Sequence, residues 1–182
     1  MARAKKSAAR ETKARAVLSA ERIMSNSSIA FQMNESNRFG ERSEGKIQYS
    51  FAEALYLINK GKMELMHGKK KLSSEKFMHI ASEKEPSFFA KYKVFHDLRE
   101  RGYIVKSALK FGADFRVYAK GVKPGEDHAK WVVFPVHESS VMTWHDFAAK
   151  NRVAHSTKKS LLIAIVDDEG DVTYYEVKWL RP

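Results

Sequence analysis

The chain has 182 residues, 43% of them hydrophobic, so it can bury a core in one large domain or two small ones. It has no cysteine, which excludes a disulfide framework and a thiol nucleophile, and no apolar run approaches the roughly 18 residues that span a bilayer. A formal net charge of +11 favours nucleic acid as partner, because so basic a surface attracts a polyanion. We therefore expect a cytoplasmic protein that binds nucleic acid and no membrane.

The beginning of the chain predicts a basic tail followed by irregular structure. Residues 1–16 are small and basic and carry too little apolar surface to order themselves, which is typical of a flexible tail. The pattern allows short strands at residues 17–24 and 29–33, and the polar segment 34–44 indicates a loop.

The strongest early signal is a helix that begins after Ser50 and ends before Gly61. Ser50 has the character of an N-cap, and Glu53 three residues later completes a capping box. A short strand and a second helix follow and complete a small N-terminal α/β domain, residues 17–85. These last elements are expected at residues 63–66 and 73–82.

Residues 86–182 predict a second domain that is mostly strand. Its first helix carries an aromatic stripe of Phe88, Tyr92 and Phe95, which is typical of a buried face. A later helix begins near Thr143. The strands are expected at residues 103–110, 115–118, 131–136, 161–166 and 172–180. The fourth of these is apolar throughout, which indicates a strand covered on both faces.

Three side chains suited to proton transfer or charge stabilisation lie at or near predicted strand ends: Tyr118, His128 and Lys159. Cleaving RNA without a metal needs a base for the 2′-hydroxyl, an acid for the departing 5′-oxygen and a cation near the phosphorus. Histidine titrates near neutrality and lysine supplies a point charge. A tyrosine base needs nearby positive charge, for which Arg116 and Lys159 are candidates. The set predicts an RNA-cleaving site.

The chain resembles the archaeal tRNA-splicing endonuclease family from about Tyr49 to the C-terminus. The segments that carry the resemblance are the basic loop ending at His128 and the stretches YSFAEALYLINKG, KYKVFHDLRERGYIVKSALKFGADFRVYAKG and RVAHSTKKSLLIAIVDDEGDVTYYEVKWL. The gaps of ten residues from Tyr118 to His128 and of thirty-one from His128 to Lys159 also agree. The resemblance implies an α+β fold. In it, a small mixed α/β domain precedes a mixed-sheet nuclease domain of the restriction-endonuclease-like kind, flanked by helices.

The same resemblance implies an activity. The family cuts precursor tRNA at the two splice sites of a bulge–helix–bulge and needs neither metal nor cofactor. The 2′-hydroxyl attacks its own phosphate and leaves a 2′,3′-cyclic phosphate and a 5′-hydroxyl. By resemblance, Tyr118 is the base, His128 the acid and Lys159 the group that stabilises the transition state.

RNA-binding residues are implied as well. In similar enzymes an Arg seven residues before the catalytic Lys stacks on a flipped base of the bulge, and Arg152 has that position. Trp179 fits the residue of a second subunit that covers the other side of the base, although it can also be a structural aromatic. Lys158 keeps the charge of an Arg that the family often has there, and Arg116 adds a cation near Tyr118.

The resemblance finally implies an oligomer. A substrate with two bulges requires two active sites, so we expect a homotetramer or a heterotetramer with a non-catalytic paralogue. An acidic hairpin loop is expected to insert into a basic cleft of a neighbouring subunit, and a solvated polar turn is the alternative. The acidic residues of this loop are Asp167, Asp168, Glu169 and Asp171.

Two other functions stay open. Glu176 and Lys178 form an E-x-K on an alternating strand, which points to a metal-dependent nuclease of the restriction-enzyme type. Its candidate metal ligands upstream are Asp114, Asp167 and Asp171. A non-catalytic RNA-binding subunit would use the basic surface alone.

Overall fold

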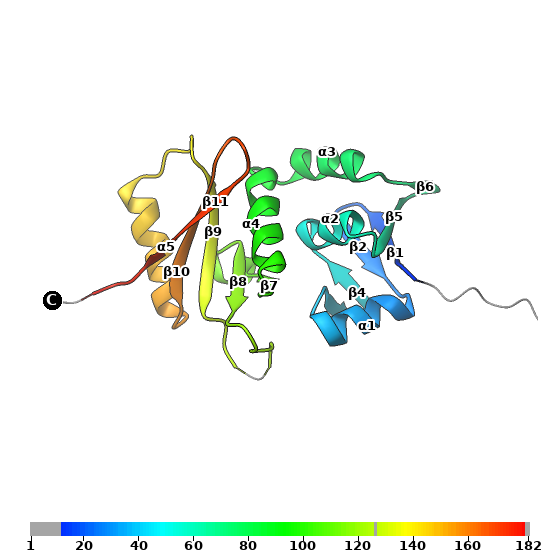
Figure 1. Ribbon diagram of the computed structural model, residues 1–182, viewed down its shortest axis with the longest axis horizontal. Helices are drawn as coiled ribbons and strands as arrows, with labels where there is room; N and C mark the ends of the chain where they lie inside the picture. The colour runs from blue at the N-terminus through cyan, green and yellow to red at the C-terminus, as the bar shows by residue number, and fades with distance from the viewer. Residues whose placement is uncertain (1–11, 126, 181–182) are drawn as a thin grey trace, which may run out of the picture.

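The computed structural model of the chain describes residues 12–125 and 127–180. It contains a six-stranded sheet in the N-terminal domain and a five-stranded mixed sheet in the C-terminal domain, with helix α4 (Phe88–Glu100) lying between them (Figure 1). The α+β fold expected from the sequence is confirmed. Within the described ranges, no helix is long and apolar enough to cross a membrane.

The N-terminal sheet has the strand order β3-β4-β2-β1-β5-β6. Its strands are β1 (Ala14–Ser19), β2 (Arg22–Ser25), β3 (Glu41–Ser43), β4 (Lys46–Tyr49), β5 (Met63–His67) and β6 (Lys70–Lys71). β1 begins inside the range expected to be a tail, because its alternating residues bury one face against the domain core. Residues 1–11 of the expected tail lie outside the described residues.

The largest difference from expectation in this domain is helix α1 (Ser28–Asn37), which replaces the strand allowed at residues 29–33. Ser27 caps the helix, and its Oγ accepts a hydrogen bond from the backbone N–H of Ala30 at 3.4 Å. The segment 34–44, expected as a loop, holds the end of this helix and strand β3.

Helix α2 (Phe51–Asn59) begins where the capping box predicted. The Oγ of Ser50 accepts from the backbone N–H of Glu53 at 3.2 Å, and Oε2 of Glu53 accepts from the N–H of Ser50 at 3.0 Å. Helix α3 (Ser74–Lys84) follows, close to the expected range.

The C-terminal sheet has the strand order β11-β10-β9-β8-β7. Its strands are β7 (Ile104–Ser107), β8 (Phe115–Tyr118), β9 (Trp131–His137), β10 (Ser160–Val166) and β11 (Val172–Val177). β9 and β10 are parallel, and the other pairs are antiparallel. Two expected strands are shorter than predicted: a 3₁₀ turn, η1 (Leu109–Phe111), ends the first, and the last stops before Trp179.

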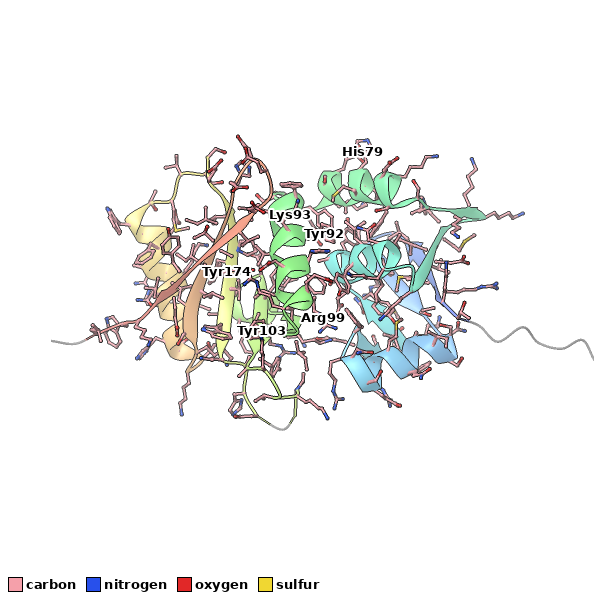
Figure 2. All side chains as sticks on the ribbon, viewed as in Figure 1. His79, Tyr92, Lys93, Arg99, Tyr103 and Tyr174 are labelled. Carbon is pink, nitrogen blue, oxygen red and sulfur yellow. The ribbon has the colours of Figure 1, made fainter. Side chains whose placement is uncertain are left out.

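Two helices cover opposite faces of this sheet (Figure 1). Leu162 of β10 packs in the large core that includes α4, and Leu161 packs in a second core with Ala154 of helix α5 (Trp144–Ser156). The prediction that this apolar strand is buried on both faces is therefore confirmed. Figure 2 shows Tyr174 on the sheet side of α4, where its hydroxyl donates to Asp97 at 2.7 Å. The aromatic stripe of α4 is buried as expected.

Candidate active site

One edge of the C-terminal sheet brings together chain segments that are far apart in sequence. β8 runs antiparallel to β9 while β10 runs parallel to it, so the end of β8 and the starts of β9 and β10 lie at the same edge. Trp131 pairs with Val117 on one side and with Ser160 on the other. Tyr118 follows Val117 in the chain and Lys159 precedes Ser160, so Tyr118 and Lys159 both lie at this edge.

A pocket of about 340 Å³ opens there, and Tyr118, His128 and Lys159 all line it. The other described residues around it are Phe111, Arg116, Gly125, Asp127 and Ala129. The structure thus brings the three candidate catalytic side chains and one further cation into a single hollow, large enough for part of a nucleotide.

The two candidate proton-transfer groups differ in their surroundings. Tyr118 is 5% exposed and belongs to the end of a regular strand. His128 is exposed and lies in the loop before β9, where its backbone N–H donates to Oδ1 of Asp127 at 2.6 Å. The phenol is therefore enclosed and held by the sheet, whereas the imidazole is open to solvent.

The C-terminal turn of helix α5 determines the position of Lys159. The backbone N–H of Lys158 donates to the carbonyl of His155 at 3.0 Å. The N–H of Lys159 donates to the carbonyl of Ala154 at 2.9 Å, which completes the hydrogen-bond pair of a Schellman motif. Lys158 has the left-handed conformation of this motif, with φ at +55°, a position that glycine usually fills. The turn ends the helix and directs the next residue into the pocket.

The ammonium group of Lys159 lies near a second cation, the guanidinium of Arg116. It lies 5.6 Å from the centre of the Phe111 ring, and Cζ of Arg116 lies 5.9 Å from the same ring. Burial, and then the positive charge of Arg116, lower the pKa of Lys159. Such a pair of cations favours an anion between or beside them, and phosphate is the anion that RNA offers.

Arg152 and Trp179 line a different pocket, of about 580 Å³, beside helix α5. Its other lining residues are Phe147, Ala148, Asn151, His155 and Ser156. Trp179 lies beyond the end of β11, half exposed, and its ring meets that of His155 edge-on at 4.5 Å. Within one chain the two expected stacking residues therefore share a pocket, whereas the resemblance placed Trp179 opposite the arginine of a second subunit. Their role in RNA binding stays a prediction.

The acidic turn between β10 and β11 is mostly exposed, and part of it contacts its own chain. Oδ1 of Asp168 lies 3.3 Å from Nε2 of His137. The side chain of Lys93 on helix α4 lies so close to Gly170 that a Cβ there would be 2.3 Å from Nζ. A lysine and a histidine of the same chain thus already contact the turn. Insertion of the turn into a neighbouring subunit stays a prediction.

The carboxylates proposed for the metal-dependent alternative are not arranged as a metal site in the described part of the chain. Over residues 12–125 and 127–180, no group of three or more His, Asp or Glu side chains could hold a metal ion. Asp114 pairs with Lys91 of α4, with Oδ1 and Nζ 3.0 Å apart.

One residue that lines the pocket and one that contacts its lining were not singled out from the sequence. Phe111 is 38% exposed and forms one wall, and the only local signal for it was an apolar side chain next to Gly112. Glu41 approaches Arg116, with Oε1 and Nη2 3.6 Å apart. It belongs to the other domain, so no local pattern connected it with the site.

The chain matches two family models that together cover most of its length. One, "tRNA intron endonuclease, N-terminal domain", matches residues 14–78, and the other, "tRNA intron endonuclease, catalytic C-terminal domain", matches residues 88–174. The chain belongs to the tRNA intron endonuclease family. It is therefore an enzyme, an endoribonuclease. The family match begins at Ala14, the first residue of β1, whereas the resemblance seen in the sequence began only at about Tyr49.

Curated members of the tRNA intron endonuclease family are similar over nearly the whole chain. Proteins named tRNA-splicing endonuclease from Thermococcus kodakarensis and Thermococcus gammatolerans are 45% and 44% identical over 165 residues, which cover 90% of this chain and 96% of theirs. The one from Methanothermobacter thermautotrophicus is 41% identical over 155 residues, 85% of this chain and 90% of its own.

Proposed function

We propose that this chain cleaves precursor tRNA at the two intron–exon junctions of a bulge–helix–bulge, by metal-independent attack of the 2′-hydroxyl. The observation that carries the proposal is the shared pocket: Tyr118, His128 and Lys159 line one hollow of about 340 Å³ in a chain of the tRNA intron endonuclease family. Each of these side chains suits one of the three roles that such a cleavage needs.

In the proposed mechanism Tyr118 removes the proton from the 2′-hydroxyl of the nucleotide before the scissile bond. The 2′-oxygen attacks the adjacent phosphorus, and His128, as imidazolium, donates a proton to the departing 5′-oxygen. Lys159 stabilises the extra negative charge on the five-coordinate phosphorus. The products are a 2′,3′-cyclic phosphate and a 5′-hydroxyl, and the proton gained by the base balances the proton lost by the acid.

The surroundings of the pocket support these roles. Arg116 and Lys159 place positive charge in the pocket that the enclosed phenol of Tyr118 also lines, where an RNA phosphate would be attracted. The exposed imidazole of His128 can recover its proton from solvent between turnovers.

RNA recognition is proposed to involve the neighbouring pocket beside α5. Arg152 stacks on a base flipped out of the bulge, and Trp179 of a second subunit covers the other side of that base. Lys158 and Arg116 contact phosphates. The two cleavage sites call for two catalytic pockets, so we propose a homotetramer or a heterotetramer, joined in part by the acidic turn at residues 167–171. A cytoplasmic location stays a prediction.

The deciding experiment is incubation of the purified protein with an intron-containing precursor tRNA in excess EDTA. We expect two cuts, with 2′,3′-cyclic phosphate and 5′-hydroxyl ends. A requirement for divalent ions, or ends with a 3′-hydroxyl and a 5′-phosphate, would instead support the metal-dependent nuclease. Tight RNA binding with no scission under any condition would point to a non-catalytic subunit.

A further inference from the structure

Basic side chains of the C-terminal domain converge on one short segment of the N-terminal domain, residues 37–41, which joins α1 to β3. The first is Arg99 of helix α4, which points toward the N-terminal domain (Figure 2). Its Nη2 donates to the carbonyl of Asn37 at 3.0 Å, and its guanidinium lies 3.8 Å from the centre of the Phe39 ring. The segment therefore belongs to the domain interface.

The second basic contact is buried and fixes the backbone of the segment. Nζ of Lys106, on β7, donates to the carbonyl of Gly40 at 2.6 Å and to that of Arg38 at 3.0 Å. The backbone N–H of Gly40 donates to Oε1 of Glu53 at 2.9 Å, and that carboxylate lies 3.6 Å from Nζ of Lys106. The carbonyl of Gly40 thus binds the C-terminal domain through Lys106, and its N–H binds helix α2 through Glu53.

Gly40 also approaches its own sheet too closely for any other residue. Its φ is +67°, and a Cβ there would lie 2.3 Å from Cγ2 of Ile47. Nδ2 of Asn34 donates to its carbonyl at 2.8 Å. The residue that follows, Glu41, therefore starts from a backbone with little freedom.

The third contact joins Glu41 to the candidate active site. Its Oε1 lies 3.6 Å from Nη2 of Arg116, which lines the pocket with Lys159. Arg116 lies directly opposite Lys106 in the register of β7 and β8, and it repels the ammonium group of Lys159, whose pKa it lowers. Nε of Arg116 is buried and has no hydrogen-bond partner in the described part of the chain. Its place in the pocket thus depends on something that offsets this repulsion.

We propose that Glu41 of the N-terminal domain is a positioning residue that holds Arg116 in the pocket. The carboxylate draws the guanidinium to the wall of the pocket, against the repulsion of Lys159. The N-terminal domain thereby contributes to the catalytic pocket without touching the substrate. The consequence for cleavage rests on the proposed function, whereas the effect on Arg116 itself does not.

Neutralising Glu41 should have different effects if it positions Arg116 than if it acts only through its negative charge. Glu41 is a negative charge near the path of a polyanion, so its neutralisation should tighten RNA binding if only the net field mattered. If Glu41 positions Arg116, the same change should slow cleavage, because the guanidinium leaves the scissile phosphate.

A double-mutant cycle tests the proposal on cleavage. We expect Glu41→Gln to lower the single-turnover rate about two- to fivefold, the range of an exposed ion pair, with the same melting temperature. The decrease should disappear in the Arg116→Gln background, because the residue through which Glu41 acts is gone. Glu35→Gln is the matched control, since Glu35 pairs with Arg42 inside the N-terminal domain at 2.6 Å. An unchanged or faster rate for Glu41→Gln, or a decrease that persists without Arg116, would overturn the proposal.

A second experiment measures hydrogen exchange of the Arg116 side chain in the protein without RNA. In ¹⁵N-labelled samples the buried Nε–H of Arg116, assigned by its loss in Arg116→Gln, should exchange with water about two- to fivefold faster in Glu41→Gln and not in Glu35→Gln. Unchanged exchange refutes the positioning role whatever the enzyme does to RNA. Faster exchange in a protein that cleaves no precursor tRNA would leave the positioning intact and refute the proposed function.

Discussion

Lys159 donates a hydrogen bond from Nζ to the carbonyl oxygen of Thr157 at 2.7 Å, so the end of helix α5 holds the ammonium group at the pocket. Thr157 is the C-cap residue, and carbonyls at a helix C-terminus carry partial negative charge. This contact favours the ammonium form, in opposition to burial and to Arg116, which lower the pKa of Lys159. The charge of Lys159 depends on the balance between these opposing effects, and a single substitution can change it.

The lowered pKa of Lys159 should be visible in a titration of its own ammonium group. Because burial and Arg116 lower this pKa, the group should lose its proton at lower pH than a free lysine, whose pKa is about 10.4. Cleavage needs the ammonium form, so this contribution is present below the pKa of Lys159 and is lost as the pH rises through it. Arg116→Gln removes one cause of the shift, so the titration should move to higher pH. NMR of the Lys159 side chain measures it directly, because the cleavage rate also depends on the protons of Tyr118 and His128; a titration that does not move in this variant would contradict the assignment.

His128→Ala should lower the cleavage rate by about 10²–10⁴-fold, because the departing 5′-oxygen loses its proton donor. Binding of a substrate with a 2′-deoxynucleotide at each cleavage site should not change. His79→Ala is the control, since His79 lies exposed on α3 and pairs only weakly with Glu83 at 3.5 Å (Figure 2). Intact scission in the His128 variant would show that another group donates the proton.

Lys158→Gly should stabilise the fold, because Lys158 adopts a left-handed conformation with φ at +55°. The left-handed conformation costs an ordinary residue about 1–2 kcal/mol, and glycine avoids most of that cost. Lys158→Ala removes the same charge but keeps the backbone strain, so the difference in unfolding free energy between the two variants isolates the conformation. Equal stability of the two would mean that the turn relaxes when the lysine is replaced.

Lys106→Met should destabilise the protein strongly, by roughly 3–5 kcal/mol, because it leaves the buried carboxylate of Glu53 without its cation. Two carbonyls of the domain interface also lose their donor. Glu53→Gln in the same chain should recover part of the loss. Denaturant unfolding measures both effects, and Lys110→Met, at an exposed position, is the control.

Neutralising the acidic turn tests the oligomer. Asp168→Asn with Glu169→Gln should shift the native mass, measured by light scattering, from that of the proposed tetramer to a smaller species. The same two charges removed from α3, at Glu75 and Glu83, should leave the mass unchanged. If the turn variant keeps the wild-type mass, the turn is a solvated loop.

The starts of α2 and α5 were predictable because capping depends on side chains three residues apart. Ser50 caps α2 as expected, and Oγ1 of Thr143 accepts from the N–H of Asp146 at 3.1 Å at the start of α5. Helix α1 was mistaken for a strand and a loop because only two of its side chains, Ala30 and Met33, are buried, so its hydrophobic period is weak.

For the candidate active site, the sequence predicted which three side chains belong to it but not the walls of the pocket around them. Resemblance selected Tyr118, His128 and Lys159, and the structure places all three around one pocket, while their chemical roles stay predictions. Phe111 and Glu41 were missed because no motif around them in the sequence indicates that they lie near Arg116 and Lys159 in the folded chain.

The sequence by itself determined the basic character of the chain, the capped helices and the alternating strands, since each of these depends on residues a few positions apart. Only the tertiary structure decided that Trp131 lies between Val117 and Ser160 and that Glu41 faces Arg116 across two domains. Strand order and domain contact are set by packing between distant segments, which no local pattern of side chains encodes.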